Sequence, residues 1–325
     1  MGAVNFDRKT RQRGAIAGVC AEQRLSDDHH GASLRDSPLP TSLDRCDKAS
    51  VSKPPILANK HVAAPSVFEP KALLREARRQ KGLAAIEVPR VCILDPDGDI
   101  VRRLRSTGQA EPFKGWPCYH TALDTFVLGG ERVGIVGCAV GAPFAVLVAE
   151  ELFASGCGLL LSLTSAGQIV PAGPPPYFVI IERALRDEGT SYHYAAPAEF
   201  AHADPRLVAL AADALAGKDL AHHVGASWTT DAPFRETAAA IEGARAKAVL
   251  AVEMEAAALY TFAHSAGTAV LCLAHVTNTM GLAVQDFEKG EADGTADALA
   301  VLDAIVEACL AHYPTIGRPA AEYPT

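Results

Sequence analysis

Short aliphatic runs alternate with helical patterns along the chain, and this alternation constrains the fold more than any other sequence feature. The runs typical of buried strands are residues 88–94, 132–140, 159–163, 177–181, 249–252 and 269–276. Several of them end at Gly, Pro, Asp or Thr residues, which favour a turn. The alternation therefore predicts an α/β domain in which helices pack on a mixed, mostly parallel sheet.

The segments between these runs carry the residues that begin and end helices. Pro143 occupies the first position of a predicted helix that Gly156 ends, and Asp204-Pro205 begin another that ends at Gly217. Further helices are predicted at residues 71–80, at 254–265 and from about Thr295 onward.

Composition divides the chain into a leader and one domain. Apolar residues make up 49% of the 325 residues, which excludes disorder over most of the length. Residues 1–60 differ, because ten Lys and Arg stand against seven Asp and Glu and large apolar residues are few. We expect a disordered leader over residues 1–65 and a single domain over 66–325.

Charge and cysteine usage exclude several classes of protein. The net charge of −8 argues against a nucleic-acid binder. The longest uncharged run, residues 152–181, is broken by glycines and prolines, so it is not a membrane helix. The eight cysteines form no Cys-x-x-Cys pair and several lie in apolar runs. This pattern favours buried thiols in a cytoplasmic protein without a metal site.

Polar clusters follow three of the strands. They are Thr164-Ser165, Thr229-Thr230-Asp231 and Thr277-Asn278-Thr279. Since ligands bind at the carboxyl ends of strands in such sheets, three clusters at one edge predict a binding pocket there.

Two carboxylates flank a methionine in Glu253-Met254-Glu255, at a predicted strand-to-helix junction inside an apolar stretch. One interpretation is a favourable interaction of acidic residues with a helix N-terminus, worth about 0.3–1 kcal/mol. The other is a carboxylate that accepts hydrogen bonds from a vicinal diol, such as the 2′- and 3′-hydroxyls of ribose. The residues alone leave both interpretations open.

Five segments, taken in order, resemble the nucleoside phosphorylase family, which includes uridine phosphorylase, hexameric purine nucleoside phosphorylase and the nucleosidases. VEMEAAA resembles the family's ribose-binding motif, GCAVGAP its Gly-rich turn and SLTSAG its phosphate and ribose loop. RDEGTSYHY resembles the base-stacking segment of the uridine phosphorylase-like members, and TTDAPFRET the strand and loop that follow. In chain order, GCAVGAP is residues 137–143, SLTSAG is 162–167, RDEGTSYHY is 186–194, TTDAPFRET is 229–237 and VEMEAAA is 252–258.

The resemblance implies a three-layer αβα sandwich and cleavage of the N-glycosidic bond of a nucleoside, with phosphorolysis as the leading expectation. It also implies a homodimer or a hexamer, no metal and no organic cofactor, with orthophosphate as a possible co-substrate. Neither nucleic acid nor a membrane is expected as a partner.

The resemblance also implies roles for individual residues. Glu255 would anchor the ribose diol, Met254 would pack beneath the sugar, and Glu253 would support or contact it. Tyr194 would stack on the base, where such contacts are worth about 1–3 kcal/mol; packing as a core aromatic is the alternative. The remaining candidates for substrate contacts are Ser165, Thr164, His193 and Arg235.

The chain departs from the family at the phosphate site. The positions of three phosphate-binding arginines correspond to Gly98, Ser162 and Thr125. Losing them removes charge-assisted hydrogen bonds, which are the strong ones. Substitutes could come from His120 or from an arginine that follows the first turn, namely Arg102, Arg103 or Arg105.

The base end departs as well. Asn278 stands where purine-cleaving members place an Asp, and an amide is not a general acid. We therefore expect Asn278 to serve a pyrimidine or another base that leaves without that proton. Two alternatives to phosphorolysis stay open, namely hydrolysis by water and a non-catalytic protein that binds nucleosides or nucleotides.

Overall fold

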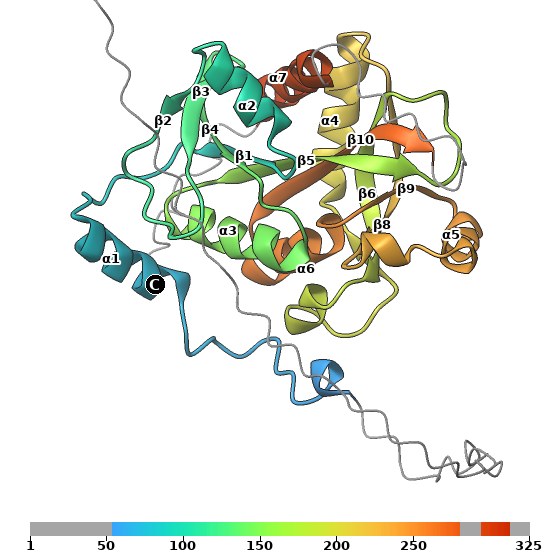
Figure 1. Ribbon diagram of the computed structural model, residues 1–325, viewed down its shortest axis with the longest axis horizontal. Helices are drawn as coiled ribbons and strands as arrows, with labels where there is room; N and C mark the ends of the chain where they lie inside the picture. The colour runs from blue at the N-terminus through green and yellow to red at the C-terminus, as the bar shows by residue number, and fades with distance from the viewer. Residues whose placement is uncertain (1–53, 280–293, 313–325) are drawn as a thin grey trace, which may run out of the picture. The chain divides into compact units, whose positions relative to one another are not determined.

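The computed structural model describes residues 54–279 and 294–312 (Figure 1). All of these residues belong to one compact unit, Ser52–Thr325. Most of the predicted leader, residues 1–53, lies outside the described residues, so its disorder stays a prediction. Its last part, residues 54–65, holds the short 3₁₀ helix η1 (Pro55–Leu57).

One sheet organises the described part of the chain, in the strand order β10-β6-β8-β9-β5-β1-β4-β3-β2, with β7 beside β6. Because β10 also pairs with β5, the strands from β10 to β5 close into a ring. The strands are β1 (Val91–Asp95), β2 (Glu111–Pro112), β3 (Asp124–Leu128), β4 (Glu131–Gly137), β5 (Leu159–Gln168), β6 (Tyr177–Asp187), β7 (Phe200–His202), β8 (His222–Thr230), β9 (Val249–Glu253) and β10 (Ala269–Thr279).

Parallel pairing brings the carboxyl ends of several strands to one edge. β1 lies parallel between β4 and β5, and β5 is also parallel to β10. β8 lies parallel between β6 and β9, whereas β3 and β6 make antiparallel pairs with β4 and β10. The predicted mixed sheet is confirmed, and its carboxyl edge gathers the turns that follow β1, β4 and β9.

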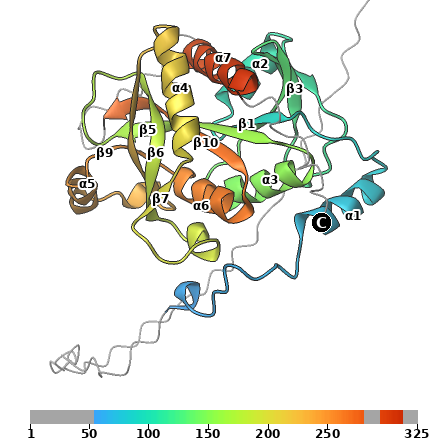
Figure 2. The same ribbon diagram turned by 180° about the vertical axis from the view of Figure 1, so that it is seen from behind.

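Helices cover both faces of the sheet (Figures 1 and 2). Helices α3 and α6 pack on one apolar face, and α2, α4 and α7 pack on the other. The helices are α1 (Pro70–Lys81), α2 (Asp99–Ser106), α3 (Ala142–Ala154), α4 (Pro205–Gly217), α5 (Ala238–Arg245), α6 (Ala256–Ala266) and α7 (Thr295–His312), with the 3₁₀ helices η2 (Thr190–His193) and η3 (Pro233–Arg235). This arrangement confirms the predicted α/β layers.

The predicted strands and helices are present with shifted ends, and the structure adds α2, α5, β2, β3 and β7, which the sequence analysis does not predict. β5 extends to Gln168, five residues beyond the predicted 159–163, because its polar end continues to pair with β10 and β9. α6 begins at Ala256 rather than at Met254, since Glu255 holds the N-cap position. Within the described residues, no helix is long and apolar enough to cross a bilayer.

Candidate functional site

The junction of β9 and α6 places Glu253 inside the protein with both carboxylate oxygens occupied. Oε1 accepts hydrogen bonds from the hydroxyls of Ser227 at 2.9 Å and Thr229 at 2.5 Å. Oε2 accepts from the backbone N–H groups of Glu255 and Ala256, each at 2.7 Å. With four donors directed at it, Glu253 caps the start of α6 and fixes the turn that carries Glu255.

Glu255 is only 1% exposed and connects two turns at the carboxyl edge of the sheet. Its Oε1 accepts from the N–H of Gly141 at 2.8 Å, and its Oε2 from the N–H of Met254 at 3.3 Å. Gly141 has a φ of +88°, a conformation that favours glycine, and it is the N-cap residue of α3. The Gly-rich turn after β4 is thus held directly against Glu255.

Burial raises the pKa of both carboxyl groups. For Glu255 it reaches about 8, because loss of solvation and the nearby charges of Glu253 and Asp97 outweigh the two backbone donors. Burial also raises the pKa of Glu253, although its four donors oppose the shift. Perturbed carboxyl groups at a sheet edge are typical of functional sites.

The turn after β1 brings a further carboxylate to the same edge. Asp97 accepts the backbone N–H of Ser165 at 2.7 Å and the Ser165 hydroxyl at 3.0 Å. Asp95, 2% exposed, holds this turn by accepting from the N–H groups of Gly98 and Val101. Burial raises the pKa of Asp95 to about 6. Ser165, a predicted substrate contact, is therefore engaged by Asp97.

The positions that correspond to the family's arginines hold small residues in tight surroundings. Gly98 has a φ of +75°, and a Cβ there would lie 2.6 Å from the Sγ of Cys138 and 2.9 Å from the Nη1 of Arg102. Ser162 is buried in β5, and Thr125 is buried in β3, where it accepts a hydrogen bond from Arg132.

Two of the four candidate replacement cations are engaged with carboxylates, whereas Arg103 and His120 have exposed side chains. Arg102 pairs with Asp99 one turn earlier in the same helix. Arg105 pairs with Asp124, with the closest approach at 2.6 Å. Within residues 54–279 and 294–312, neither Asp97 nor Glu255 forms an ion pair with a cationic side chain. The part of the site formed by the turn after β1 is therefore acidic.

The family model of the phosphorylase superfamily matches residues 90–307, which include all of the segments just described. The chain belongs to this superfamily. A curated uridine phosphorylase of Thermococcus kodakarensis is 27% identical to this chain over 172 residues. That match covers 47% of this chain and 62% of the relative, so the chain spans less than two thirds of the relative's length.

Solved structures share the fold of this superfamily member. The crystal structure of uridine phosphorylase from Vibrio fischeri ES114 matches with a TM-score of 0.56 at 20% identity, over 71% of this chain and 94% of that chain. The same enzyme complexed with 6-hydroxy-1-naphthoic acid matches with a TM-score of 0.55. At this identity the likeness concerns the fold, and it confirms the predicted architecture.

Tyr194 and His193 lie apart from the Glu255 contacts, beside a cavity of about 450 Å³. The Tyr194 hydroxyl donates to Glu150 of α3, and its ring packs edge-on against Phe262 at 5.8 Å. His193 is exposed, and its Nδ1 lies 3.0 Å from the Nζ of Lys60. Pro143 also lines this cavity, so the Gly141–Pro143 turn lies between it and Glu255.

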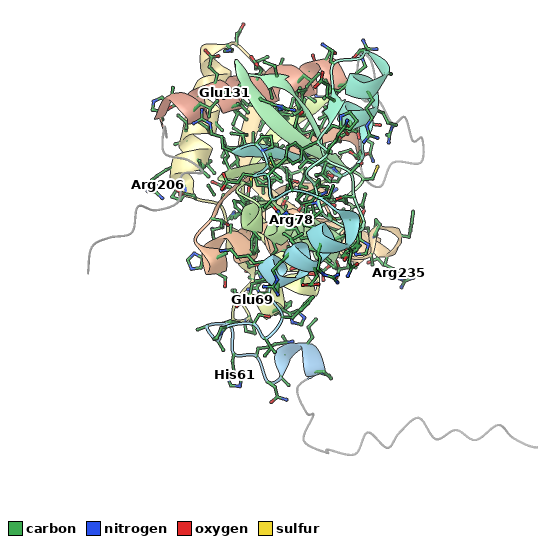
Figure 3. The ribbon with its side chains drawn as sticks, turned by 90° about the vertical axis from the view of Figure 1, so that its left-hand side faces the viewer. His61, Glu69, Arg78, Glu131, Arg206 and Arg235 are labelled. Atoms are coloured by element: carbon green, nitrogen blue, oxygen red, sulfur yellow. The ribbon has the colours of Figure 1, made fainter. Side chains whose placement is uncertain are left out.

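The other predicted site residues are placed as follows. Thr164 and Asn278 lie on the neighbouring strands β5 and β10, and Met254 is half-buried beside Glu255. Arg235 in η3 is exposed at the periphery of the molecule (Figure 3). The structure therefore gathers the residues around Glu253 and Ser165, whereas Arg235 is not part of that contact network.

A larger cavity of about 620 Å³ lies near the start of β10 and the C-terminal end of α6, and His202 and His264 are among its lining residues. It is remote from Glu255, which lies at the other end of α6, so we assign the site by its buried carboxylates rather than by volume. In the part of the chain that the structure describes, no group of three His, Cys, Asp or Glu side chains is arranged to hold a metal.

Sequence reasoning missed two members of the site. Asp97 follows the first predicted strand, and a carboxylate next to the missing arginine position is the signal that could have identified it. Thr229 was assigned to a polar cluster, but its hydroxyl bridges two elements. It donates to Glu253 and accepts the N–H of Ala257 at 2.9 Å.

Proposed function

We propose that this chain cleaves the N-glycosidic bond of a ribonucleoside. The observation that carries the proposal is Glu255, a buried carboxyl group suspended between the N–H groups of Gly141 and Met254. A helix-capping role alone does not account for it, because Glu255 makes no side-chain cap on α6 and Glu253 already satisfies the first N–H groups.

Cleavage builds positive charge on the sugar as the bond to the base breaks, and a carboxylate close to the ring stabilises that charge. The pKa of about 8 keeps the Glu255 carboxyl group largely protonated at neutral pH. Hydroxyl donors from a ribose diol and developing charge on the sugar both favour the ionised form. Glu255 would therefore interact more strongly with the transition state than with the free nucleoside.

The remaining roles follow the superfamily pattern. Met254 would pack beneath the sugar, and Glu253 would position Glu255 through its four hydrogen bonds. Asn278 would contact the base without donating a catalytic proton. Tyr194 would supply its ring at the base end, beside the 450 Å³ cavity. No cofactor is needed for this chemistry.

Orthophosphate is the acceptor that the names of the relatives support, and it would yield ribose 1-phosphate. The deciding experiment incubates a panel of purine and pyrimidine nucleosides with the full chain, with and without phosphate. Chromatography then detects the free base, ribose and ribose 1-phosphate. Release of base from at least one nucleoside is expected, and its absence across the panel would contradict the proposal.

A non-catalytic nucleoside-binding protein is the second candidate, favoured by the small residues Gly98 and Ser162 at the arginine positions. Calorimetric binding of a nucleoside without release of base would support it. We also propose a homodimer or hexamer, as the superfamily pattern implies. Light scattering at micromolar concentration tests this, and a monomer would contradict it.

A further inference from the structure

We propose that Lys60 is a positioning residue that orients His193 as a hydrogen-bond donor, and that this donor selects bases with a carbonyl oxygen. The inference rests on the proposed cleavage of a nucleoside and names the class of base that the site would take. Lys60 belongs to residues 54–69, which we call the strap. The strap precedes residues 90–307, the region that the superfamily model matches, so the family likeness assigns it no role.

The strap is anchored on the segment that carries His193. Its 3₁₀ helix η1 contacts η2, and Ile56 packs so closely that a Cβ on Gly189 would lie 3.1 Å from its Cδ1. Asp231, in the turn after β8, accepts the N–H of Gly189 at 2.8 Å. Glu188 accepts the N–H of Ser191 at 2.9 Å and so holds the start of η2. The segment around η2 is therefore fixed between the strap and the turn after β8.

The contact of Lys60 determines which nitrogen of His193 carries the proton. The Nζ of Lys60 lies 3.0 Å from the Nδ1 of His193. An ammonium group only donates, so Nδ1 accepts, and the proton of the neutral ring resides on Nε2. Lys60 thereby leaves His193 with an Nε2–H donor and places a positive charge behind the ring.

His193 lies where the proposed function puts the base. It is followed by Tyr194, whose ring would stack on the base, and both residues line the cavity of about 450 Å³. This volume falls within the range of small-molecule sites, which is roughly 300–1,000 Å³. Phe68 of the strap also lines the cavity. The strap thus supplies an apolar wall and, through Lys60, the orientation of a donor.

The other polar groups around the base leave a place for this donor. Tyr194 already donates its hydroxyl to Glu150, and a carboxylate offers acceptors only. Arg235 is exposed at the periphery of the molecule. The group complementary to the Nε2–H of His193 is an acceptor oxygen, such as the carbonyl of uracil or hypoxanthine. A base without that carbonyl leaves the donor unpaired and binds less tightly.

Calorimetry on the full chain measures the preference for a carbonyl group. Two pairs of nucleosides serve as probes, inosine with purine riboside and uridine with pyrimidin-2-one riboside, because the second member of each pair lacks one carbonyl oxygen. The wild-type protein should bind the carbonyl member of at least one pair about three- to tenfold more tightly, as expected for one hydrogen bond. Equal affinity within both pairs would overturn the proposal.

Variants assign the preference to Lys60. Lys60→Met keeps an aliphatic side chain but removes the donor, so the preference should fall to within about twofold, as it should in His193→Phe. Lys60→Arg should retain most of the preference, because it still donates. Lys71→Met removes an exposed lysine in the first turn of α1 and should leave the preference unchanged. A preference that survives in Lys60→Met, or that is lost equally in Lys71→Met, would overturn the proposal.

The tautomer of His193 gives a readout that needs no substrate. Nitrogen NMR of the imidazole ring distinguishes the Nε2–H form from the Nδ1–H form, and the spectrum of His193→Phe identifies the signal. The wild-type protein should show the Nε2–H form, and Lys60→Met should show an increased share of the Nδ1–H form. An unchanged spectrum in Lys60→Met would overturn the role of Lys60.

Thermal melting confirms that each variant is folded before binding is compared. The failure of this inference is distinguishable from the failure of the proposed function. A chain that binds nucleosides but cleaves none contradicts the proposed cleavage, and the carbonyl preference is still measured. A chain that binds no nucleoside of either pair contradicts both.

Discussion

The two ends of the site are built from the same kind of residue but differ in what their carboxylates contact. At the sugar end, Glu255 is 1% exposed and accepts backbone N–H groups from two turns. At the acceptor end, Asp97 is only partly buried and covers the donors of Ser165. In the proposed function, the first arrangement would offer a carboxyl group to the sugar, whereas the second occupies donors that a co-substrate would use.

The difference shows that resemblance to a family does not carry evenly across a site. The sugar end retains the motif that predicted it, with Glu253, Met254 and Glu255 at one junction. The acceptor end keeps the turn and the serine but holds a carboxylate beside the expected position of a cation. Substrate and acceptor can thus diverge independently in one fold, because separate loops supply them.

The largest expected effect is the dependence of stability on pH at the sugar end. An unfolded Glu ionises near pH 4.5, whereas Glu255 in the folded chain ionises near pH 8. Between these values the folded state holds a proton that the unfolded state has lost, so raising the pH favours unfolding. One pKa unit corresponds to about 1.4 kcal/mol, so the full contribution is on the order of several kcal/mol.

Chemical denaturation of the empty protein from pH 5 to pH 9 measures this effect. The free energy of unfolding should fall as the pH rises, and Glu255→Gln should flatten the curve between pH 5 and about pH 8. Asp95, with a pKa of about 6, contributes in the same direction at the lower end of this window. An unchanged pH profile in Glu255→Gln would place the titration elsewhere.

The next largest effect concerns recognition of the sugar. Glu255→Gln preserves the side-chain volume but removes one acceptor oxygen and the ability to ionise when a sugar binds. Loss of a hydrogen bond to a charged group costs about 1.5–3 kcal/mol, which is roughly a ten- to hundredfold loss of ribonucleoside affinity. Calorimetry with ribonucleosides and their 2′,3′-dideoxy analogues tests it. If ribonucleosides and their dideoxy analogues bind the wild-type protein equally tightly, Glu255 has only a structural role at the start of α6.

Glu253 provides the matched comparison, because it is a neighbouring carboxylate with a different role. Glu253→Gln places an amide N–H₂ against groups that already donate, so at least one buried hydrogen bond is lost. We expect a loss of about 1–3 kcal/mol in the free energy of unfolding. The ribonucleoside affinity of the folded fraction should change less than in Glu255→Gln. A Glu253→Gln protein of wild-type stability but poor affinity would reverse the two roles.

The sequence was a good guide to the main strands and helices and to the Glu-Met-Glu junction between β9 and α6, for a physical reason. Aliphatic runs such as residues 269–276 report burial directly, and Asp204-Pro205 begins α4 by capping and backbone geometry that are local. The Glu-Met-Glu motif is local too. These features depend on residues that are neighbours in the chain, which is what a sequence displays.

Long-range contacts could not be read in the same way. Asp97 and Ser165 are separated by 68 positions, and their meeting depends on β1 pairing with β5. The pairing of β10 with β5, which closes the ring of strands, could not be predicted either, because no local sequence pattern indicates which distant strands pair. Arg235 lies in a segment that resembles a family motif, but its side chain is exposed and does not contact the buried carboxylates. Resemblance in sequence therefore did not predict its place in the structure.

The smallest effect is expected at Tyr194, in the cavity next to the sugar end. Its hydroxyl donates to Glu150, and burial together with that carboxylate raises the pKa of Tyr194. Tyr194→Phe removes the hydrogen bond but keeps the ring, so the free energy of unfolding should fall by about 0.5–1.5 kcal/mol. Ribonucleoside affinity should stay within twofold of wild type if the ring is what contacts the base, because stacking does not use the hydroxyl.

Tyr194→Ala is the matched variant, since it removes the ring as well and should weaken binding roughly tenfold or more. Calorimetry on both variants at a temperature where each is folded decides between the two roles. If Tyr194→Ala binds nucleoside as wild type does, the ring belongs to the packing of α3 and α6, and the base is held by other residues.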